Sequence, residues 1–267
     1  MTMNNVSRNI VLAFTASVII FPIIPLFIWS VSDSWTYPDL FPDGFSFDNF
    51  IEFFNTYSLG EVIVNSILIS TVVTVVSVLM AIMPAKYIGT KRFRGKIAIQ
   101  TLTMMPVMAP AVIVLFGLLN VFVKLGIYKT FLSLVICEAI FMIPYATMVL
   151  VPIFKNYDPG VEDQASTLGI NRYSTLFNIT LPSIKTGLMV SSMYVFMSSW
   201  ATYLAVSMFA PRTFNTVASL LYPAIANGQY SYNMLASLTV LFFVPSIVFL
   251  ILSTWIIGTD KINNQRI

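Results

Sequence analysis

Long apolar stretches without a charged residue alternate with short polar segments along this chain of 267 residues. The charge-free runs occupy 9–32, 62–85, 97–123, 139–154, 186–211 and 213–259. A transmembrane helix needs about 20 consecutive, mostly apolar residues, and most of these runs reach that length. The pattern predicts an all-α membrane protein with six transmembrane helices, at about 9–31, 62–85, 98–123, 130–154, 187–209 and 234–258.

Prolines and glycines modify this picture in two places. Between 210 and 233 the apolar chain is interrupted by Pro211, Pro223 and Gly228, which favours a surface loop with one short helix over a seventh span. Within the predicted spans, proline removes a backbone donor and crowds the preceding turn. We therefore expect kinks at these prolines: Pro106, Pro110 and Pro144.

The composition excludes a soluble enzyme. Hydrophobic residues make up 57% of the chain and charged residues only 9%, whereas a soluble domain carries roughly 25% charged residues. The absence of histidine excludes a His-based triad and a His-ligated metal site, and the single Cys137 excludes an intrachain disulfide. The apolar run near the N-terminus is too long for a typical signal peptide, so we interpret it as a retained first helix.

Lysine and arginine are distributed unequally between the two sides that six helices define. The N-terminus, the second and fourth loops and the tail together carry eleven, whereas the other loops carry three. Because cytoplasmic loops are enriched in these residues, both termini are predicted to be cytoplasmic. The larger set is Arg8, Lys86, Lys91, Arg92, Arg94, Lys96, Lys155, Arg172, Lys185, Lys261 and Arg266.

The first loop, 32–61, is acidic and aromatic. It contains Asp33, Asp39, Asp43, Asp48, Glu52 and Glu61 among Trp35, Tyr37, Phe41, Phe45, Phe47, Phe50, Phe53, Phe54 and Tyr57. One interpretation is a helix in the lipid headgroups, where Trp and Tyr are enriched. The other is a docking surface for an external partner, or a funnel that attracts cationic solutes. The two interpretations do not exclude each other.

The fourth loop, 155–186, is far longer than the roughly 2–8 residues that usually connect two helices. Asp158-Pro-Gly160 predicts a turn, and Glu162 and Asp163 suit the positive end of a helix that follows it. Gly169 is expected to end that helix. A second helix then follows, with Tyr173, Leu176, Phe177 and Thr180 on one face and with Leu181-Pro182 as its end. The loop is thus predicted to be a helical hairpin beneath the membrane.

This hairpin resembles the EAA loop of bacterial ABC importer permeases. The family pattern E-A-A-x-x-x-G, followed by I-x-L-P, is matched by Asp163-Gln-Ala-Ser-Thr-Leu-Gly169 and Ile179-Thr-Leu-Pro182 in the same register. Asp replaces Glu, Gln replaces the first Ala, and Thr186 stands where a further Pro is common.

Other segments are similar to the same family along most of the chain. Phe93-Arg-Gly-Lys96 resembles the polyamine-type permeases, and Ser199-Trp-Ala-Thr-Tyr-Leu204 resembles several permeases for sugars and polar solutes. Glu138 lies six residues before Pro144, at a position where relatives of this family often have His. The resemblance implies one permease domain, 1–267, with the type I ABC importer fold and six helices.

The resemblance also implies that the hairpin is a coupling helix, which inserts into a groove of a separate ATPase subunit. The residues that match this role are Asp163, Gln164, Ala165, Leu168, Gly169, Ile170, Leu181 and Pro182. The alternative is an amphipathic helix that lies on the membrane without a protein partner. The motif G-x-x-x-x-G-K-[ST] does not occur in the chain, so ATP and Mg are expected to act in the partner ATPase, and no cofactor is expected here.

The solute pathway is predicted from one intramembrane carboxylate and its neighbours. Such carboxylates are costly and usually face a cavity or a partner. Glu138 therefore either lines the pathway or has a purely structural partner. Ser199, Trp200 and Tyr203 are further candidates, since Trp200 and Tyr203 are three residues apart on one face of the fifth span, although such pairs also occur in ordinary packing.

The expected function is that of a non-catalytic permease subunit in an ATP-driven importer of the bacterial cytoplasmic membrane. Its expected partners are two ATPase subunits, a homologous or identical permease, an external solute-binding protein and the bilayer, but no nucleic acid. A polyamine-like solute is the first expectation, with phosphonate, thiamine and sugar as alternatives. An ion-gradient-driven transporter or channel is the rival class, although no internal repeat supports it. A membrane scaffold without transport is the third.

Overall fold

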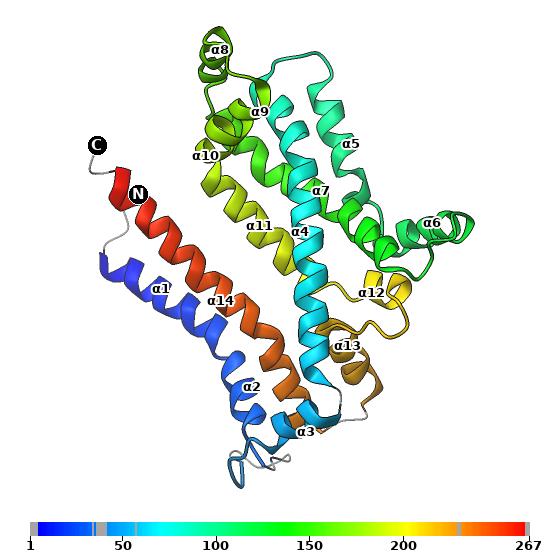
Figure 1. Ribbon diagram of the computed structural model, residues 1–267. Helices are drawn as coiled ribbons and strands as arrows, with labels where there is room; N and C mark the ends of the chain where they lie inside the picture. The colour runs from blue at the N-terminus through cyan, green and yellow to red at the C-terminus, as the bar shows by residue number, and fades with distance from the viewer. Residues whose placement is uncertain (1–4, 34, 36–41, 57, 229–230, 265–267) are drawn as a thin grey trace. The chain divides into compact units, whose positions relative to one another are not determined.

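The computed structural model describes residues 5–33, 35, 42–56, 58–228 and 231–264, and the regular structure in these ranges is helical apart from one isolated bridge, Ser32–Phe45. Figure 1 shows the helices in chain order. They are α1 Asn5–Ile20, α2 Ile23–Ser30, α3 Asp48–Thr56, α4 Leu59–Thr90, α5 Lys96–Met108, α6 Ala111–Lys124, α7 Phe131–Lys155, α8 Gly160–Thr167, α9 Arg172–Thr175, the π-helix η1 Leu176–Thr180, α10 Leu181–Ser183, α11 Lys185–Trp200, α12 Leu204–Phe209, α13 Val217–Asn227 and α14 Tyr232–Asn264.

The chain forms two compact units. One comprises Met1–Val62 and Leu220–Pro245, and the other comprises Ile63–Ser219 and Ser246–Ile267. Among the described residues, α4 and α7 are each long and apolar enough to cross a membrane. The bent pair α5 and α6 becomes a third candidate if it counts as one span. The other predicted spans fall on helices that are shorter, interrupted or apolar over only part of their length.

The structure divides three of the predicted spans. The first is split into α1 and α2 around Phe21 and Pro22, and the fifth is split into α11 and α12 between Trp200 and Leu204. The third is split into α5 and α6, whose axes meet at 88°. Ala109 is extended at this break, with φ −77° and ψ 146°, because the ring of Pro110 disfavours helical backbone in the preceding residue.

The other two prolines predicted to form kinks lie inside helices that continue past them. Pro106 is within α5 and Pro144 is within α7. A proline removes one hydrogen bond from a helix, and neighbouring helices can hold the chain in place around it. Of these three prolines, Pro110 alone separates two helices, and the residue before it has left the helical conformation.

α7 is the central helix of the larger unit, and α11 lies beside it along its length (Figure 1). α7 begins with a capping box, in which Thr130 Oγ1 accepts from the Ser133 N–H and Ser133 Oγ accepts from the Thr130 N–H, both at 3.2 Å. Phe209 of α12 packs near this end, with its ring centroid 5.4 Å from that of Phe122 and 6.2 Å from that of Tyr128.

Two glycines allow α4 and α11 to approach the C-terminal end of α7 closely. A Cβ added at Gly89 of α4 would lie 2.5 Å from Phe154 Cβ and 3.1 Å from the Val151 carbonyl oxygen. A Cβ added at Gly187 of α11 would lie 2.7 Å from Ile153 Cγ1. Small residues permit such close packing of membrane helices, so the end of α7 that leads into the long loop is held from two sides.

In the smaller unit, polar side chains join the first loop to α3 and α14. Asn233 Nδ2 donates to the Asp33 carbonyl at 3.1 Å, and Ser237 Oγ donates to the Ser30 carbonyl at 2.8 Å. Asn49 Nδ2 of α3 donates to the Ser32 carbonyl at 3.0 Å. These bonds give buried backbone oxygens a partner and fix the end of α2.

α3 carries an apolar stripe on its exposed side. Phe47, just before the helix, and Ile51 and Phe54 within it follow helical spacing, and all three side chains are exposed. The stripe fits the predicted helix in the headgroups and equally fits a docking surface, so both interpretations of this loop stay open. Among the acidic and aromatic residues of this loop, Tyr37, Asp39, Phe41 and Tyr57 lie outside the described residues.

Candidate functional site

The long loop begins with a short helix that has a well-defined start and end. Asp158 Oδ1 accepts from the Gly160 N–H at 2.8 Å, and the carboxylates of Glu162 and Asp163 lie in the first turn of α8, where the helix dipole favours negative charge. As the sequence predicts, the helix starts at the Asp-Pro-Gly turn, with Gly160 as its first residue.

α8 ends in a Schellman motif around Gly169. The Ile170 N–H donates to the Ala165 carbonyl at 3.0 Å, and the Gly169 N–H donates to the Ser166 carbonyl at 3.1 Å. Gly169 has φ +78°, a left-handed conformation that glycine adopts without steric cost. A Cβ placed on it would meet nothing within 4 Å, so the glycine is required by the backbone conformation and not by lack of space within the chain.

The second half of the loop is a composite helix. Asn171 Oδ1 accepts from the Ser174 N–H at 2.8 Å and caps α9, which continues through η1 into α10. Pro182 was expected to end this helix, but the helix runs through Pro182 to Ser183. The preceding turn is widened into a π-helix, a geometry that accommodates a proline with no N–H to donate.

The same wide turn separates the side chains predicted to share one face. Tyr173 and Phe177 are exposed, whereas Thr180 is buried. A π-turn contains more residues than an α-turn, so it rotates Thr180 away from the positions that an ideal helix would give it. The loop therefore presents an aromatic outer side and a polar inner side.

The predicted coupling residues separate into a tip and a root. Asp163, Gln164, Leu168, Gly169 and Ile170 are exposed at the α8 end and the turn that follows it. Leu168 is 81% exposed, which is high for an apolar side chain. Ala165 is instead buried against its own chain, and Leu181 and Pro182 lie at the root next to α11. The tip residues are thus available to a partner, while Ala165 is not.

Glu162, in the first turn of α8, is not among the predicted coupling residues, yet it pairs with a distant lysine. The Glu162 carboxylate accepts from Lys86 Nζ of α4 at 2.6 Å through Oε2. Its Oε1 accepts from Tyr157 Oη at 2.8 Å and from Thr180 Oγ1 at 2.7 Å. The acidic pair in the first helical turn was visible in the sequence, but the partner Lys86 is 76 residues away and no local spacing connects them.

The environment of this cluster alters two titrations. Partial burial alone would raise the pKa of Glu162, but the hydrogen bonds from Lys86, Thr180 and Tyr157 outweigh it and hold the pKa below its ordinary value. Burial raises the pKa of the Tyr157 hydroxyl, and the neighbouring Glu162 carboxylate adds to that effect. Glu162 is therefore ionised and Tyr157 neutral near pH 7.

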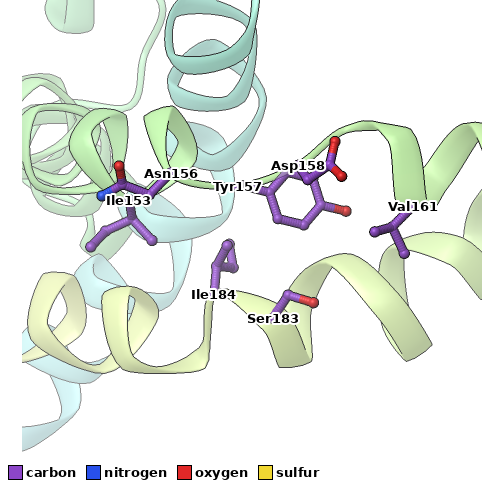
Figure 2. A pocket seen from close by; sticks show the side chains of 7 residues that line it. All are labelled: Ile153, Asn156, Tyr157, Asp158, Val161, Ser183 and Ile184. Carbon is purple, nitrogen blue, oxygen red and sulfur yellow. The ribbon is translucent and has the colours of Figure 1, made fainter.

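A cavity of about 410 Å³ lies at the root of the loop (Figure 2). It is lined by Ile153, Asn156, Tyr157, Asp158, Val161, Ser183 and Ile184. Figure 2 shows these side chains coming from the end of α7, from the turn before α8, from α8 and from the end of α10 next to α11. The lining mixes amide, hydroxyl and carboxylate groups with branched apolar groups.

The pathway candidates lie deeper in the larger unit. Ser199 Oγ donates to Glu138 Oε2, which joins α11 to α7, and both residues are buried. Glu138 Oε1 has no hydrogen-bond partner among the described residues. Trp200 is buried and Tyr203 is half-buried.

The sequence suggested that Trp200 and Tyr203 share one helical face. The structure shows that they do not, because they lie on either side of a break. α11 ends at Trp200, and Tyr203 precedes α12. At the break, Thr202 Oγ1 donates to the Ser198 carbonyl at 2.9 Å. Such a local side-chain bond competes with the backbone hydrogen bonds of a continuous helix.

Residues 77–267 match the family described as the binding-protein-dependent transport system inner membrane component. The chain belongs to this family. It is thus a permease of the ABC importer class, and its role is that of a transport subunit in a multi-pass membrane assembly. The matched range contains Lys86, Glu138 and the whole of the long loop.

Two relatives show how far the likeness to known permeases extends. The inner membrane ABC transporter permease protein YcjP of Escherichia coli is 26% identical over 220 residues, which is 81% of this chain and 79% of the relative. The spermidine/putrescine permease protein PotC of Haemophilus influenzae is 30% identical over 143 residues, which is 52% of this chain and 54% of that protein.

A solved permease structure supports the fold. The crystal structure of a bacterial ABC transporter that imports the acidic polysaccharide alginate contains a chain that aligns with a TM-score of 0.76. The alignment covers 95% of this permease and 98% of that chain at 15% identity. The all-helical architecture is therefore that of an ABC importer permease, whereas solutes as different as spermidine and alginate among the relatives leave the solute open.

Proposed function

We propose that this permease is one membrane-spanning subunit of an ATP-driven importer in the bacterial cytoplasmic membrane. In this proposal an external binding protein delivers a small polar solute, and the permease lets it through by alternating access. The observation that carries the proposal is the tip of the long loop, where exposed Leu168 and Ile170 flank the left-handed Gly169.

The exposed tip is well suited to a protein partner. Leu168 and Ile170 are exposed apolar side chains on either side of Gly169, and covering them would remove apolar surface from water. The Schellman motif fixes the turn between the two helices, so docking would cost little backbone ordering. Two ATPase subunits, which use ATP and Mg, and a second permease that is homologous or identical complete the proposed complex.

The proposed membrane arrangement keeps six spans with both termini in the cytoplasm. The broken segments α1 with α2, α5 with α6 and α11 with α12 would then each cross the bilayer as one interrupted span. Broken helices are tolerated within membranes where neighbouring helices cover the freed backbone groups. In this arrangement the basic loop around Arg94 and the long loop lie on the same side as the ATPase.

For the pathway we propose the region between α7 and α11 around Glu138 and Ser199. Glu138 lies inside the candidate span α7, and its Oε1 has no hydrogen-bond partner among the described residues. A carboxyl group in such a place supports a position beside the pathway. Trp200 and Tyr203 flank the break at the end of α11, where the helix can change direction. Because Glu138 and Ser199 are buried here, contact with solute requires that the two helices separate during transport.

A polyamine-like cation is our first proposal for the solute. It rests on the local likeness of Phe93-Arg-Gly-Lys96 to polyamine permeases and on the 30% identity to PotC over 52% of the chain. Phosphonate, thiamine and sugar remain alternatives, since the binding protein largely determines the solute of such an importer.

Co-purification from a strain that expresses all subunits tests the proposal. A tag on this permease should retain the ATPase in stoichiometric amount, and solute-loaded binding protein should stimulate ATP hydrolysis. Leu168→Asp should release the ATPase, while Leu125→Asp, a matched change at an exposed leucine outside the loop, should not. Absence of an ATPase from the gently purified wild-type complex would refute the proposal.

A further inference from the structure

Glu162 connects the coupling loop to a different membrane helix than the two that precede and follow the loop. The loop is covalently attached to α7 and α11 at its ends. Lys86 belongs to α4, four residues before that helix ends at Thr90. Its ammonium group lies 2.6 Å from Glu162 Oε2 in the first turn of α8. The ion pair is therefore a non-covalent bridge from the coupling helix to α4.

Both oxygens of the Glu162 carboxylate accept hydrogen bonds. While Lys86 occupies Oε2, the hydroxyls of Tyr157 and Thr180 both donate to Oε1. The four residues come from α4, the turn before α8, α8 itself and η1. A charged acceptor with three donors makes stronger hydrogen bonds than a neutral one, and its orientation is fixed.

Partial burial makes this pair more significant than an ordinary surface ion pair. The side chains of Lys86 and Glu162 are 28% and 19% exposed. Exposed pairs contribute little because water screens them, whereas a partly desolvated pair with further hydrogen bonds is costly to break. The depressed pKa of Glu162 agrees with a stabilised charge.

We propose that the Lys86–Glu162 pair is the link through which movement of the coupling helix reaches α4. The inference rests on the proposed docking of the loop to an ATPase. Glu162 and Lys86 act as positioning residues, which touch neither ATP nor solute. When the ATPase displaces α8, the end of α4 follows because the ion pair and the two hydroxyls resist separation. Close packing at Gly89, three residues after Lys86, transmits the same displacement to α7.

The test measures coupling separately from assembly. Lys86→Gln and Glu162→Gln are each introduced into the complete complex, which is purified by a tag on this permease and reconstituted in liposomes. Retention of the ATPase should equal that of the wild type, because the exposed tip is unchanged. Solute imported per ATP hydrolysed should fall about tenfold, the factor expected when a charge-assisted hydrogen bond is lost.

Three further variants separate a link from a general structural role. The exchange Lys86→Glu with Glu162→Lys restores opposite charges and should recover most of the coupling. Thr180→Val keeps the side-chain shape and removes one donor, so its effect should be about twofold to threefold. Lys91→Gln removes the same charge from an exposed position just beyond α4 and should leave the ratio unchanged.

The outcomes are distinct. Wild-type coupling in both single variants, loss of the ATPase from them, or an exchange variant no better than the singles would each overturn the link. If the wild-type complex itself retains no ATPase, the proposed function fails instead.

Discussion

At position 169 the backbone is left-handed and the space around the absent side chain is open, so the effects of strain and of docking can be separated experimentally. A non-glycine residue in this conformation costs roughly 1–2 kcal/mol. We expect Gly169→Asp to leave the helices inserted but to release or uncouple the ATPase, since the new side chain projects from the docking tip. ATPase retention and solute uptake measure this.

Gly95 provides the matched control for that variant. It has φ +87° and equally open surroundings, but it lies in the loop before α5 and outside the docking tip. Gly95→Asp should therefore show the same strain without losing the ATPase. Equal losses in the two variants would mean that strain alone explains the effect and that Gly169 has no docking role.

Glu138 either joins α7 to α11 as a packing contact or takes part in the solute pathway. Glu138→Gln keeps the side-chain volume and an oxygen that can accept from Ser199, so assembly and ATP hydrolysis should persist. Glutamine cannot lose a proton, and losing about 1 kcal/mol of hydrogen bonding to the solute should lower uptake about fivefold if Glu138 takes part in the pathway.

The control for Glu138 is Glu52→Gln at an exposed carboxylate of α3. If uptake by Glu138→Gln equals that of the control, Glu138 only joins α7 to α11. Collapse of the complex in Glu138→Gln would likewise assign it a structural role.

At the scale of helices, the contact at Gly89 decides how tightly α4 packs against α7. Gly89→Ala places a methyl group 2.5 Å from Phe154 Cβ and close to a backbone oxygen, so the helices must move apart. Overpacking of this kind typically costs about 1–3 kcal/mol. We expect a lower midpoint of thermal inactivation for the purified permease.

Gly117→Ala is the appropriate comparison because it is also a glycine within a helix, and an added Cβ meets nothing within 4 Å. Alanine is the better helix former, so this variant should be neutral or slightly stabilised. A Gly89→Ala variant as stable as Gly117→Ala would show that the packing of α4 on α7 can relax without cost.

Helix positions were largely predictable, while helix continuity was not. Apolar runs predicted α4 and α7 well, because length and the absence of charge are properties of the sequence alone. Pro106, Pro110 and Pro144 looked equivalent in the sequence, yet only Pro110 separates two helices. Proline disfavours helical backbone in the residue before it, yet only Ala109 has left the helix, while Met105 and Ile143 lie inside α5 and α7.

At the scale of the whole molecule, contacts between distant segments were the part that the sequence could not reveal. The end of α8 at Gly169 is local, and the sequence predicted it. The Lys86–Glu162 pair and the Ser199–Glu138 bond join residues 76 and 61 positions apart. With one sequence, no periodicity relates such residues, and only the folded packing of α4, α7, α8 and α11 brings them together.

The number of membrane crossings depends on α5 and α6. Each contains about a dozen residues and spans roughly 20 Å at 1.5 Å per residue, which is less than the roughly 30 Å apolar core of a bilayer. With an angle of 88° between them, the pair is either one broken span or a re-entrant loop that returns to its starting side. The six-span proposal requires the broken span.

Labelling of introduced cysteines in intact cells distinguishes these arrangements. Native Cys137 is buried and should not react with a reagent that does not cross membranes. Four exposed positions each receive one cysteine: Phe45, Arg94, Leu125 and Ser166. We expect Phe45→Cys and Leu125→Cys to be labelled from outside, and Arg94→Cys and Ser166→Cys to be labelled only after permeabilisation. A re-entrant α5 and α6 would instead protect Leu125→Cys and expose Ser166→Cys, which would place the coupling loop outside the cell and contradict both the six-span topology and the proposed ATPase contact.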